Sequence, residues 1–77
     1  MKIRKNFFNG KEQKVYIYEN KKEEYIVVAL PQCNWSISFS YDEDLVEEKM
    51  QKTLLKVMDK DSAIEVSKKI EQWTREM

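Results

Sequence analysis

The sequence predicts an α+β domain in which an antiparallel meander of three to four strands is followed by two amphipathic helices packed on one face. Three observations predict this class. Short strand-like segments, of which residues 35–41 alternate strictly, make up the chain as far as Tyr41, and beyond Asp42 apolar residues recur at about every 3.6 positions. The segments between the apolar stretches are too short for the crossovers that parallel strands need. A chain of 77 residues has room for one core, so residues 1–77 are expected to form a single domain.

The strands of the meander are predicted from four segments. Residues 35–41 alternate large apolar side chains with serines, which is the period of a strand. The side chains of this strand that are expected to face the core are Trp35, Ile37, Phe39 and Tyr41. Residues 24–30 are apolar on both faces, as expected for a central strand covered on both sides, and residues 13–18 form a third strand. Residues 3–8 add at most an edge strand, because lysine and arginine interrupt their apolar pattern.

Two helices are predicted after the strands, each from a capping box and an apolar stripe. The first is expected to begin near Asp42, because Ser40 and Glu43 have capping-box spacing and acidic residues follow. Its apolar stripe is Val46, Met50, Leu54 and Val57. The second is expected to begin near Ser62, which has the same spacing to Glu65. Its stripe is Ala63, Val66, Ile70, Trp73 and Met77. The short break between the helices predicts antiparallel neighbours.

Cysteine usage and hydropathy indicate a cytoplasmic protein. Cys33 is the only cysteine and histidine is absent, so an intramolecular disulfide is impossible and a reducing compartment is favoured. Polar residues interrupt the apolar segment that a signal peptide would need after the basic N-terminus. The longest uncharged stretch, residues 25–41, contains too many polar residues for a membrane span. No membrane association is therefore expected.

The residue types argue against an enzyme. Cys33 has no histidine to generate its thiolate and is better explained as a small buried hydrophobe. The acidic segment at residues 42–48 is explained by helix capping, and it lacks the glycine and the alternate spacing of an EF-hand loop. The chain has no glycine-rich phosphate loop. We therefore expect no catalytic, cofactor-binding or metal-binding residues, and no cofactor.

The aromatic residues favour a non-enzymatic protein–protein interaction or regulatory module. Both tryptophans are in register with apolar stripes and are expected in the core. Tyr16 and Tyr18 lie on the strand face opposite Val15 and Ile17, so one of these pairs is expected to be exposed as a partner surface. Small domains with strand edges to cover often gain burial by association. The expected partner is a protein, and in particular a second copy of the chain in a homodimer. The expected contact is the Tyr16/Tyr18 face or the edge of the strand at residues 13–18.

Two other function classes are weighed against this one. The first is a nucleic-acid-binding regulator that uses the basic N-terminal segment, with contacts from Lys2, Arg4, Lys5, Lys11 and Lys14. The formal net charge of 0 argues against it, because nucleic-acid-binding modules are usually strongly basic. The second is a metal-dependent enzyme built from carboxylates, which would need a cleft that so small a domain has little room for.

Residues 16–25 read YIYENKKEEY, residues 35–41 read WSISFSY and residues 73–77 read WTREM. Together these three stretches resemble the YueH-like family of small Gram-positive bacterial proteins. The resemblance implies a bacterial cytosolic protein of unknown role and carries over no site residues. A looser likeness is to the HicB-like antitoxin domain, in which a three-stranded meander leads into a helix. The glycine–cysteine pair that follows the proline in that family is replaced here by Gln32-Cys33, and a second helix is predicted where that family has a further strand. This likeness is therefore one of topology.

Overall fold

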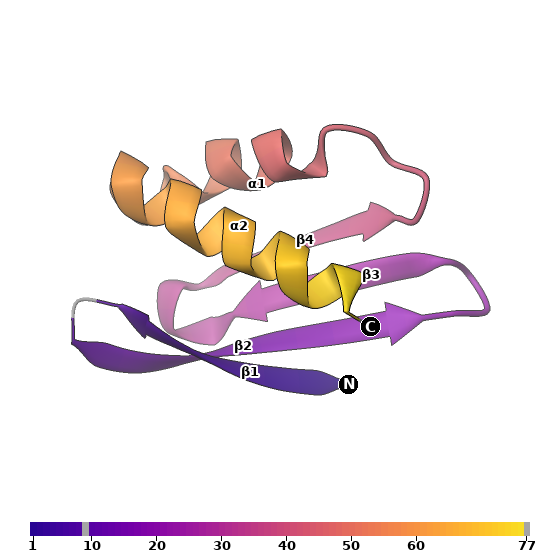
Figure 1. The fold of residues 1–77 in the computed structure, drawn as a ribbon, viewed down its shortest axis with the longest axis horizontal. Coiled ribbons are helices and arrows are strands. Elements are labelled where there is room, and N and C mark those ends of the chain that lie inside the picture. Colours follow the sequence, from indigo (N-terminus) through magenta and orange to yellow (C-terminus); the bar gives the residue numbers. More distant parts are fainter. Residues whose placement is uncertain (9, 77) are drawn as a thin grey trace. The chain divides into compact units, whose positions relative to one another are not determined.

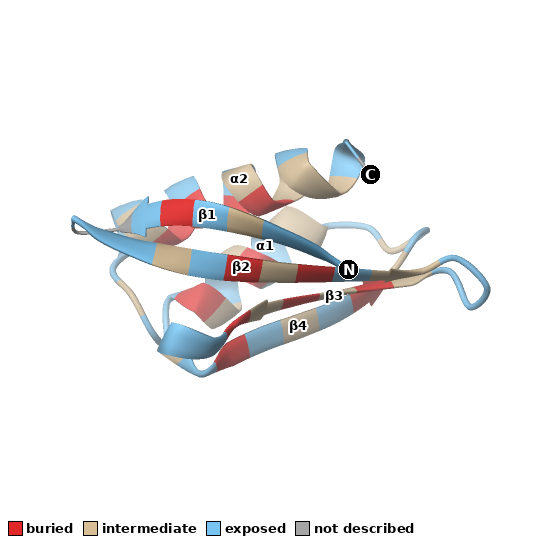
Figure 2. Ribbon diagram, turned by 90° about the horizontal axis from the view of Figure 1, so that it is seen from below, coloured by how far each residue is buried: buried red, intermediate tan, exposed pale blue. Residues whose placement is uncertain are grey.

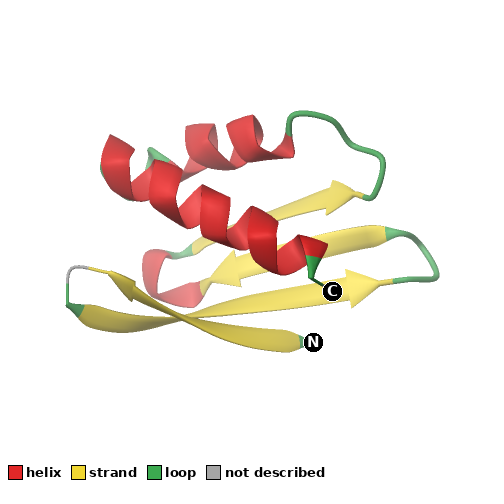
Figure 3. Ribbon diagram, in the orientation of Figure 1, coloured by secondary structure: helices red, strands yellow, loops and turns green. Residues whose placement is uncertain are grey.

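The computed structural model of the chain describes residues 1–8 and 10–76. Four strands precede two helices, which confirms the α+β class (Figures 1 and 3). The elements are β1 (Lys2–Phe8), β2 (Lys11–Asn20), β3 (Tyr25–Leu30), the 3₁₀ helix η1 (Pro31–Cys33), β4 (Trp35–Ser40), α1 (Val46–Leu54) and α2 (Lys60–Arg75). The contacts divide the chain into two compact units, which are a sheet unit of residues 1–43 and a helical unit of residues 44–77.

The sheet unit is an antiparallel meander in which the strands lie in the order β1-β2-β3-β4. β3 lies between β2 and β4, so the prediction of a central strand at residues 24–30 is confirmed. β1 pairs with β2 along its whole length, from Lys2 opposite Ile17 to Phe8 opposite Lys11. The predicted edge strand at residues 3–8 is therefore present, and the sheet has four strands.

One face of the sheet is largely buried, and we call it the inner face. The register of β2, β3 and β4 places Ile17, Val28 and Ile37 in one row on this face. Its other buried apolar residues are Val15, Ile26, Leu30, Trp35 and Phe39. Figure 2 shows the resulting alternation of buried and less buried residues along the strands. Because Val15 and Ile17 are fully buried, the more exposed pair on β2 is Tyr16 and Tyr18.

The opposite face, which we call the outer face, is less covered than the sequence indicates. Tyr25, Val27 and Ala29 of β3 point to this face and are only half-buried. The prediction that β3 is covered on both sides is therefore wrong for the outer face. Apolar and β-branched side chains suit a pleated surface, but they do not by themselves require a second layer of protein above it.

β4 ends earlier than predicted. The Glu43 N–H donates to the Ser40 carbonyl at 3.2 Å, and this turn takes Tyr41 out of the strand. Tyr41 is 44% exposed, so the prediction that it faces the core is wrong. Trp35 and Phe39 are buried as predicted, whereas Ile37 between them is half-buried.

α1 begins later than the capping-box spacing predicts. The Ser40 and Glu43 pair forms the turn after β4, so it is not available as a helix cap. The helix begins at Val46 after Leu45, which has a left-handed backbone with φ of 60°, and no side chain of the described residues caps this end. The predicted start near Asp42 is therefore wrong, because the turn after β4 uses the residues that could have capped the helix.

α1 also ends earlier than its apolar stripe predicts. The Leu54 carbonyl accepts from the N–H groups of both Val57 and Met58 at 3.0 Å. Such shared bonds tighten the last turn and satisfy the end of a helix. Val57 therefore lies outside the helix, and its predicted place in the stripe is wrong. Met50 and Leu54 are fully buried, which confirms the central part of the stripe.

α2 begins at Lys60, before the predicted start. The Asp59 carboxylate accepts from the Ser62 N–H at 3.3 Å, which makes Asp59 the N-cap and places Ser62 in the first turn. The predicted start at Ser62 is wrong because the aspartate ahead of it caps the same end. The helix can then extend back to the aspartate, since Lys60 and Asp61 are compatible with a first turn.

The apolar stripe of α2 is confirmed for Ala63, Val66 and Ile70, which are buried. Trp73 is half-buried, so its predicted place in the core is reached only in part. Met77 lies outside the described residues. Within the helical unit α1 and α2 lie side by side and run in opposite directions, as predicted (Figure 1). No helix in the described part of the chain is both long and apolar enough to cross a lipid bilayer.

Candidate functional site

The outer face of the sheet carries a patch of apolar and aromatic side chains from three neighbouring strands. We call this patch the tyrosine surface, and it consists of Ile3, Tyr16, Tyr18, Tyr25, Val27 and Ala29. Tyr18 is 39% exposed, Ile3 is 52% exposed, and the other members are half-buried. Single exposed apolar residues are ordinary on proteins, whereas a contiguous exposed patch marks a contact surface.

The strand register brings the members of the tyrosine surface together. Ile3, Tyr16 and Ala29 form one row across β1, β2 and β3. Tyr18 lies in the next row, opposite a valine of β3. The ring centroids of Tyr18 and Tyr25 are 6.2 Å apart and the rings are tilted by 58°, which is a favourable arrangement for an aromatic pair. The patch is therefore continuous across the strands.

Sequence reasoning identifies Tyr16 and Tyr18 of this patch and misses the other members. Tyr25 is missed because its strand is apolar on both faces, which the sequence presents as evidence of burial. The signal that could have found it is the hairpin register, since β2 and β3 pair Asn20 with Tyr25 and so place alternate residues of β3 beside the two tyrosines of β2. In addition, the Asn20 amide donates to the Tyr25 hydroxyl at 3.4 Å.

The basic N-terminal residues do not gather on one face. Lys5 and Lys14 lie directly opposite each other on the outer face, and Lys5 Nζ is 3.3 Å from Glu12 Oε1. The remaining candidates for nucleic-acid contact are placed by the register on the other side of the sheet: Lys2, Arg4 and Lys11. The five residues proposed as a nucleic-acid contact are therefore split between two faces.

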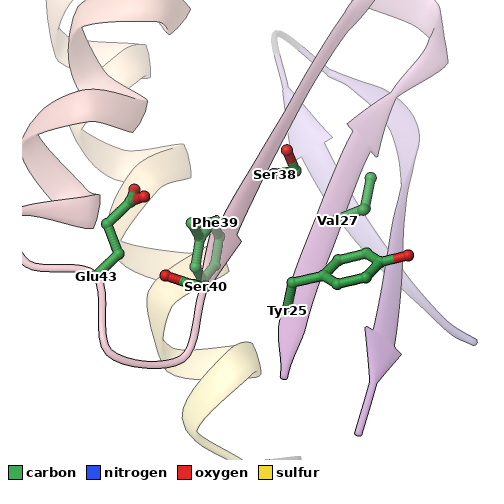
Figure 4. Close-up of a pocket in the computed structure, with 6 residues that line it drawn as sticks. All are labelled: Tyr25, Val27, Ser38, Phe39, Ser40 and Glu43. Carbon is green, nitrogen blue, oxygen red and sulfur yellow. The ribbon is translucent and has the colours of Figure 1, made fainter. Parts of the chain in front are cut away.

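A hollow of about 470 Å³ lies against β3 and β4 within the sheet unit (Figure 4). The residues that line it are Tyr25, Val27, Ser38, Phe39, Ser40 and Glu43. The Tyr25 hydroxyl and the Glu43 carboxylate point away from each other, so they do not form an acid–base pair (Figure 4). The lining also contains no lysine, arginine or cysteine. The hollow therefore borders the tyrosine surface at Tyr25 and Val27.

A hydrogen bond ties the segment after β4 to the end of β2. The Tyr41 hydroxyl donates to Glu19 Oε2. This bond raises the pKa of Tyr41 to about 12, and desolvation and the negative charges of Glu19 and Glu24 act in the same direction. The contact therefore links the segment after β4 to the end of β2 within the sheet unit.

The helical unit contains a contact between two carboxyl groups, those of Glu47 on α1 and Glu71 on α2. A hydrogen bond with Glu71 raises the pKa of Glu47, with desolvation and the Glu71 charge adding to the effect and the charges of Lys68 and Arg75 opposing it. Arg75 also forms an ion pair with Glu71. These four residues and Gln72 line a hollow of about 450 Å³. Sequence spacing alone does not predict this pair, because its members are far apart in the chain.

Cys33 and the acidic segment are the other residues that the sequence offers for chemistry. Cys33 lies in η1 as a free, half-exposed thiol, so its expected burial is reached only in part. Within residues 1–8 and 10–76, no three histidine, cysteine, aspartate or glutamate side chains are grouped so that they could hold a metal ion. The tyrosine surface is therefore the feature of the sheet unit with the clearest relation to binding.

Comparison with known proteins identifies relatives of the whole chain. A family model described as YueH-like protein matches residues 2–76. The chain is also 40% identical over 82 residues to YueH, an uncharacterized protein of Bacillus subtilis (strain 168), with 100% of both chains covered. No solved structure matches the chain significantly. The family resemblance of the three sequence stretches is thus confirmed over nearly the full length.

Proposed function

The chain belongs to the YueH-like family, and we propose that it is a cytoplasmic, non-enzymatic interaction module that binds a partner protein through the tyrosine surface and acts as a self-associated unit. The proposal rests on the outer face of the sheet. The tyrosine surface is made of apolar and aromatic side chains, which favours binding over catalysis.

The composition of the tyrosine surface is the observation that carries the proposal. All of its members are uncharged, and the charged residues that β1 and β2 place on the outer face, which are Lys5, Glu12 and Lys14, lie on one side of it. Protein interfaces have an apolar core enriched in aromatic residues and a polar rim. Tyrosine also supplies a large contact area with few rotatable bonds, so a partner can bind it with little loss of side-chain entropy. This pattern is typical of a surface that binds protein.

A nucleic-acid partner is less favoured by the same geometry. Strands of nucleic acid are bound through several cations along one groove, with aromatic rings for base stacking. Of the five candidate residues in the N-terminal segment, only Lys5 and Lys14 share a face with the tyrosines, and Lys5 already forms an ion pair with Glu12. The tyrosine surface therefore has the stacking groups of a nucleic-acid site without enough positive charge beside them.

Site-specific photo-crosslinking in the cells that produce the protein tests this proposal. A benzophenone amino acid is placed at Tyr18, in the tyrosine surface, and at Leu55, which is 50% exposed in the helical unit and serves as the matched control. We expect irradiation at position 18 to give a discrete protein adduct that mass spectrometry identifies. Excess unlabelled protein should compete this adduct away.

Two results would contradict the proposal. One is a level of adduct at position 18 that is no higher than at position 55. The other is an adduct that nuclease treatment removes, which would establish a nucleic-acid partner instead. Salt provides an independent check, because binding that depends on lysines weakens steeply with salt whereas an apolar protein interface does not.

A further inference from the structure

At the free edge of β4, alternate residues direct their backbone N–H and C=O groups away from the sheet. β4 has a single neighbour in the sheet, which is β3. The Tyr41 N–H donates to the Glu24 carbonyl at 3.0 Å, so Glu24 and Tyr41 form a hydrogen-bonded pair. In an antiparallel sheet such pairs alternate with pairs that are not hydrogen-bonded. Alternation then directs the N–H and C=O groups of Ser36 and Ser38 away from β3. The Ser40 carbonyl also points away from β3, since it accepts from the Glu43 N–H in the turn that ends the free edge.

β4 lacks the features that usually protect an edge strand. It has no charged residue and no proline, and each of its residues has one partner on β3, so it contains no bulge. The other edge strand, β1, carries Lys2, Arg4 and Lys5. Exposed edges without charge or bulges are templates for pairing with another strand. The two edges of this sheet therefore differ, and only β4 is suited to pairing.

We infer that β4 pairs with β4 of a second copy of the chain, in antiparallel orientation, around a two-fold axis at Ile37. In this register Ser36 lies opposite the partner's Ser38, and each such pair exchanges both of its N–H···O bonds. On the inner face Trp35 lies opposite the partner's Phe39, which is a favourable cross-strand pair of aromatic rings. The inference rests on the self-association in the proposed function and assigns it to one strand.

Charge explains why the occupant is a second copy. Pairing around a two-fold axis places a strand against itself, so a charged strand would bring like charges together. β1 would do this with its lysines and arginine, whereas β4 has no charge to oppose. Ile37 gives a second indication, because it is half-buried between the buried Trp35 and Phe39. The partner's Ile37 would cover it at the two-fold axis.

The pairing also has a consequence for the tyrosine surface. Residues that lie opposite each other in an antiparallel pair point to the same side of the sheet. The outer faces of both copies would therefore form one side of a continuous sheet. A partner protein would meet two tyrosine surfaces on that side, and bivalent binding of this kind strengthens weak single contacts.

Sedimentation velocity of the full chain at tens of micromolar tests the inference. The wild-type protein is expected to be a dimer. Ser38→Pro removes an edge N–H in each copy, and proline is tolerated where an edge strand faces solvent, so the variant should fold but dimerise roughly tenfold or more weakly. Ser38→Ala keeps the N–H and is the matched control, which should remain dimeric. Circular dichroism of both variants checks that the fold is retained.

A charge-complementation experiment keeps the test valid if proline disturbs the strand. The double variants Ser36→Lys/Ser38→Lys and Ser36→Glu/Ser38→Glu change exposed side chains only. Each alone should be monomeric, because like charges face each other across the axis, and an equimolar mixture should restore the dimer. Restoration supports the register, and its failure with two folded variants overturns it.

Failure of the inference can be distinguished from failure of the proposed function. A wild-type dimer that persists undiminished in Ser38→Pro and in both charged variants overturns the β4 pairing but leaves self-association intact. A wild-type chain that stays monomeric at tens of micromolar overturns both the pairing and the self-association. The photo-crosslink at Tyr18 reports on the partner surface in either case, because that residue lies away from β4.

Discussion

The assignment of the two sheet faces can be tested with one substitution made at neighbouring positions of β2, as Ile17→Thr and Tyr18→Thr. Ile17 is fully buried on the inner face, whereas Tyr18 is 39% exposed on the outer face. Threonine has a high strand propensity, so both variants keep the local preference of the chain. Any difference in the free energy of unfolding then reports the surroundings of the two side chains.

The size of the effect follows from what each change removes. Ile17→Thr deletes a methyl-sized group, which costs about 0.8 kcal/mol, and buries an unpaired hydroxyl, which costs about 1–3 kcal/mol. The expected loss is about 2–4 kcal/mol, out of the roughly 4–12 kcal/mol typical of a chain of this length. Tyr18→Thr leaves a polar group in solvent but removes the ring pair with Tyr25, so it should cost about 0.5–1.5 kcal/mol, which is less than Ile17→Thr.

Urea denaturation followed by tryptophan fluorescence and circular dichroism measures these losses. With a urea dependence of about 1–2 kcal/mol/M, the midpoint of Ile17→Thr should fall by roughly 2 M, and that of Tyr18→Thr should fall by about 1 M or less. All samples need the same protein concentration, since association contributes to apparent stability. If Tyr18→Thr lost as much stability as Ile17→Thr, the outer face would be covered in solution and the argument for the tyrosine surface would fail.

Three further predictions concern titratable groups. Hydrogen bonds to the first turn of α2 lower the pKa of Asp59 below its usual 3.8, so its contribution is present above that value and is lost as the pH falls through the folded-state pKa. Asp59→Ala should therefore reduce helix content by circular dichroism at neutral pH and have no effect in strong acid. The contact with Glu71 raises the pKa of Glu47 above its usual 4.5, so its contribution is present below that value and is lost as the pH rises through the folded-state pKa. Glu47→Gln should raise the Tm at neutral pH and not in acid, and a lower Tm at neutral pH would refute this reasoning. The bond to Glu19 should make one tyrosine ionise at a pH of about 12 in an absorbance titration, and Tyr41→Phe should remove that step. The stability that this bond contributes is expected to be lost between about pH 10 and 12, because the folded-state pKa is the higher one.

Much of the fold could be predicted because hydrophobic period is a local property of the chain. Alternation predicts the burial of Ile17 and Trp35, and helical spacing predicts that of Ile70. Capping was predicted less well, because several residues competed for each helix end. Asp59 caps α2 in place of Ser62, and the predicted cap of α1 is part of the turn after β4.

The candidate site also combines features that one segment predicts with features that depend on how segments pair. Tyr16 and Tyr18 could be identified from the sequence, because their positions on one strand follow from alternation alone. Their contact with Tyr25 depends on how β2 and β3 pair, and register joins residues from different strands. The carboxyl contact between Glu47 and Glu71 depends in the same way on how two helices pack.

The sequence by itself determined the order and type of the elements, and it determined which side chains of each element share a face. Only the tertiary structure decided that the outer face of β3 stays half-exposed and that β4 is an edge without charge. The reason is that period and charge belong to a segment of chain, whereas exposure depends on whether another segment comes to cover it.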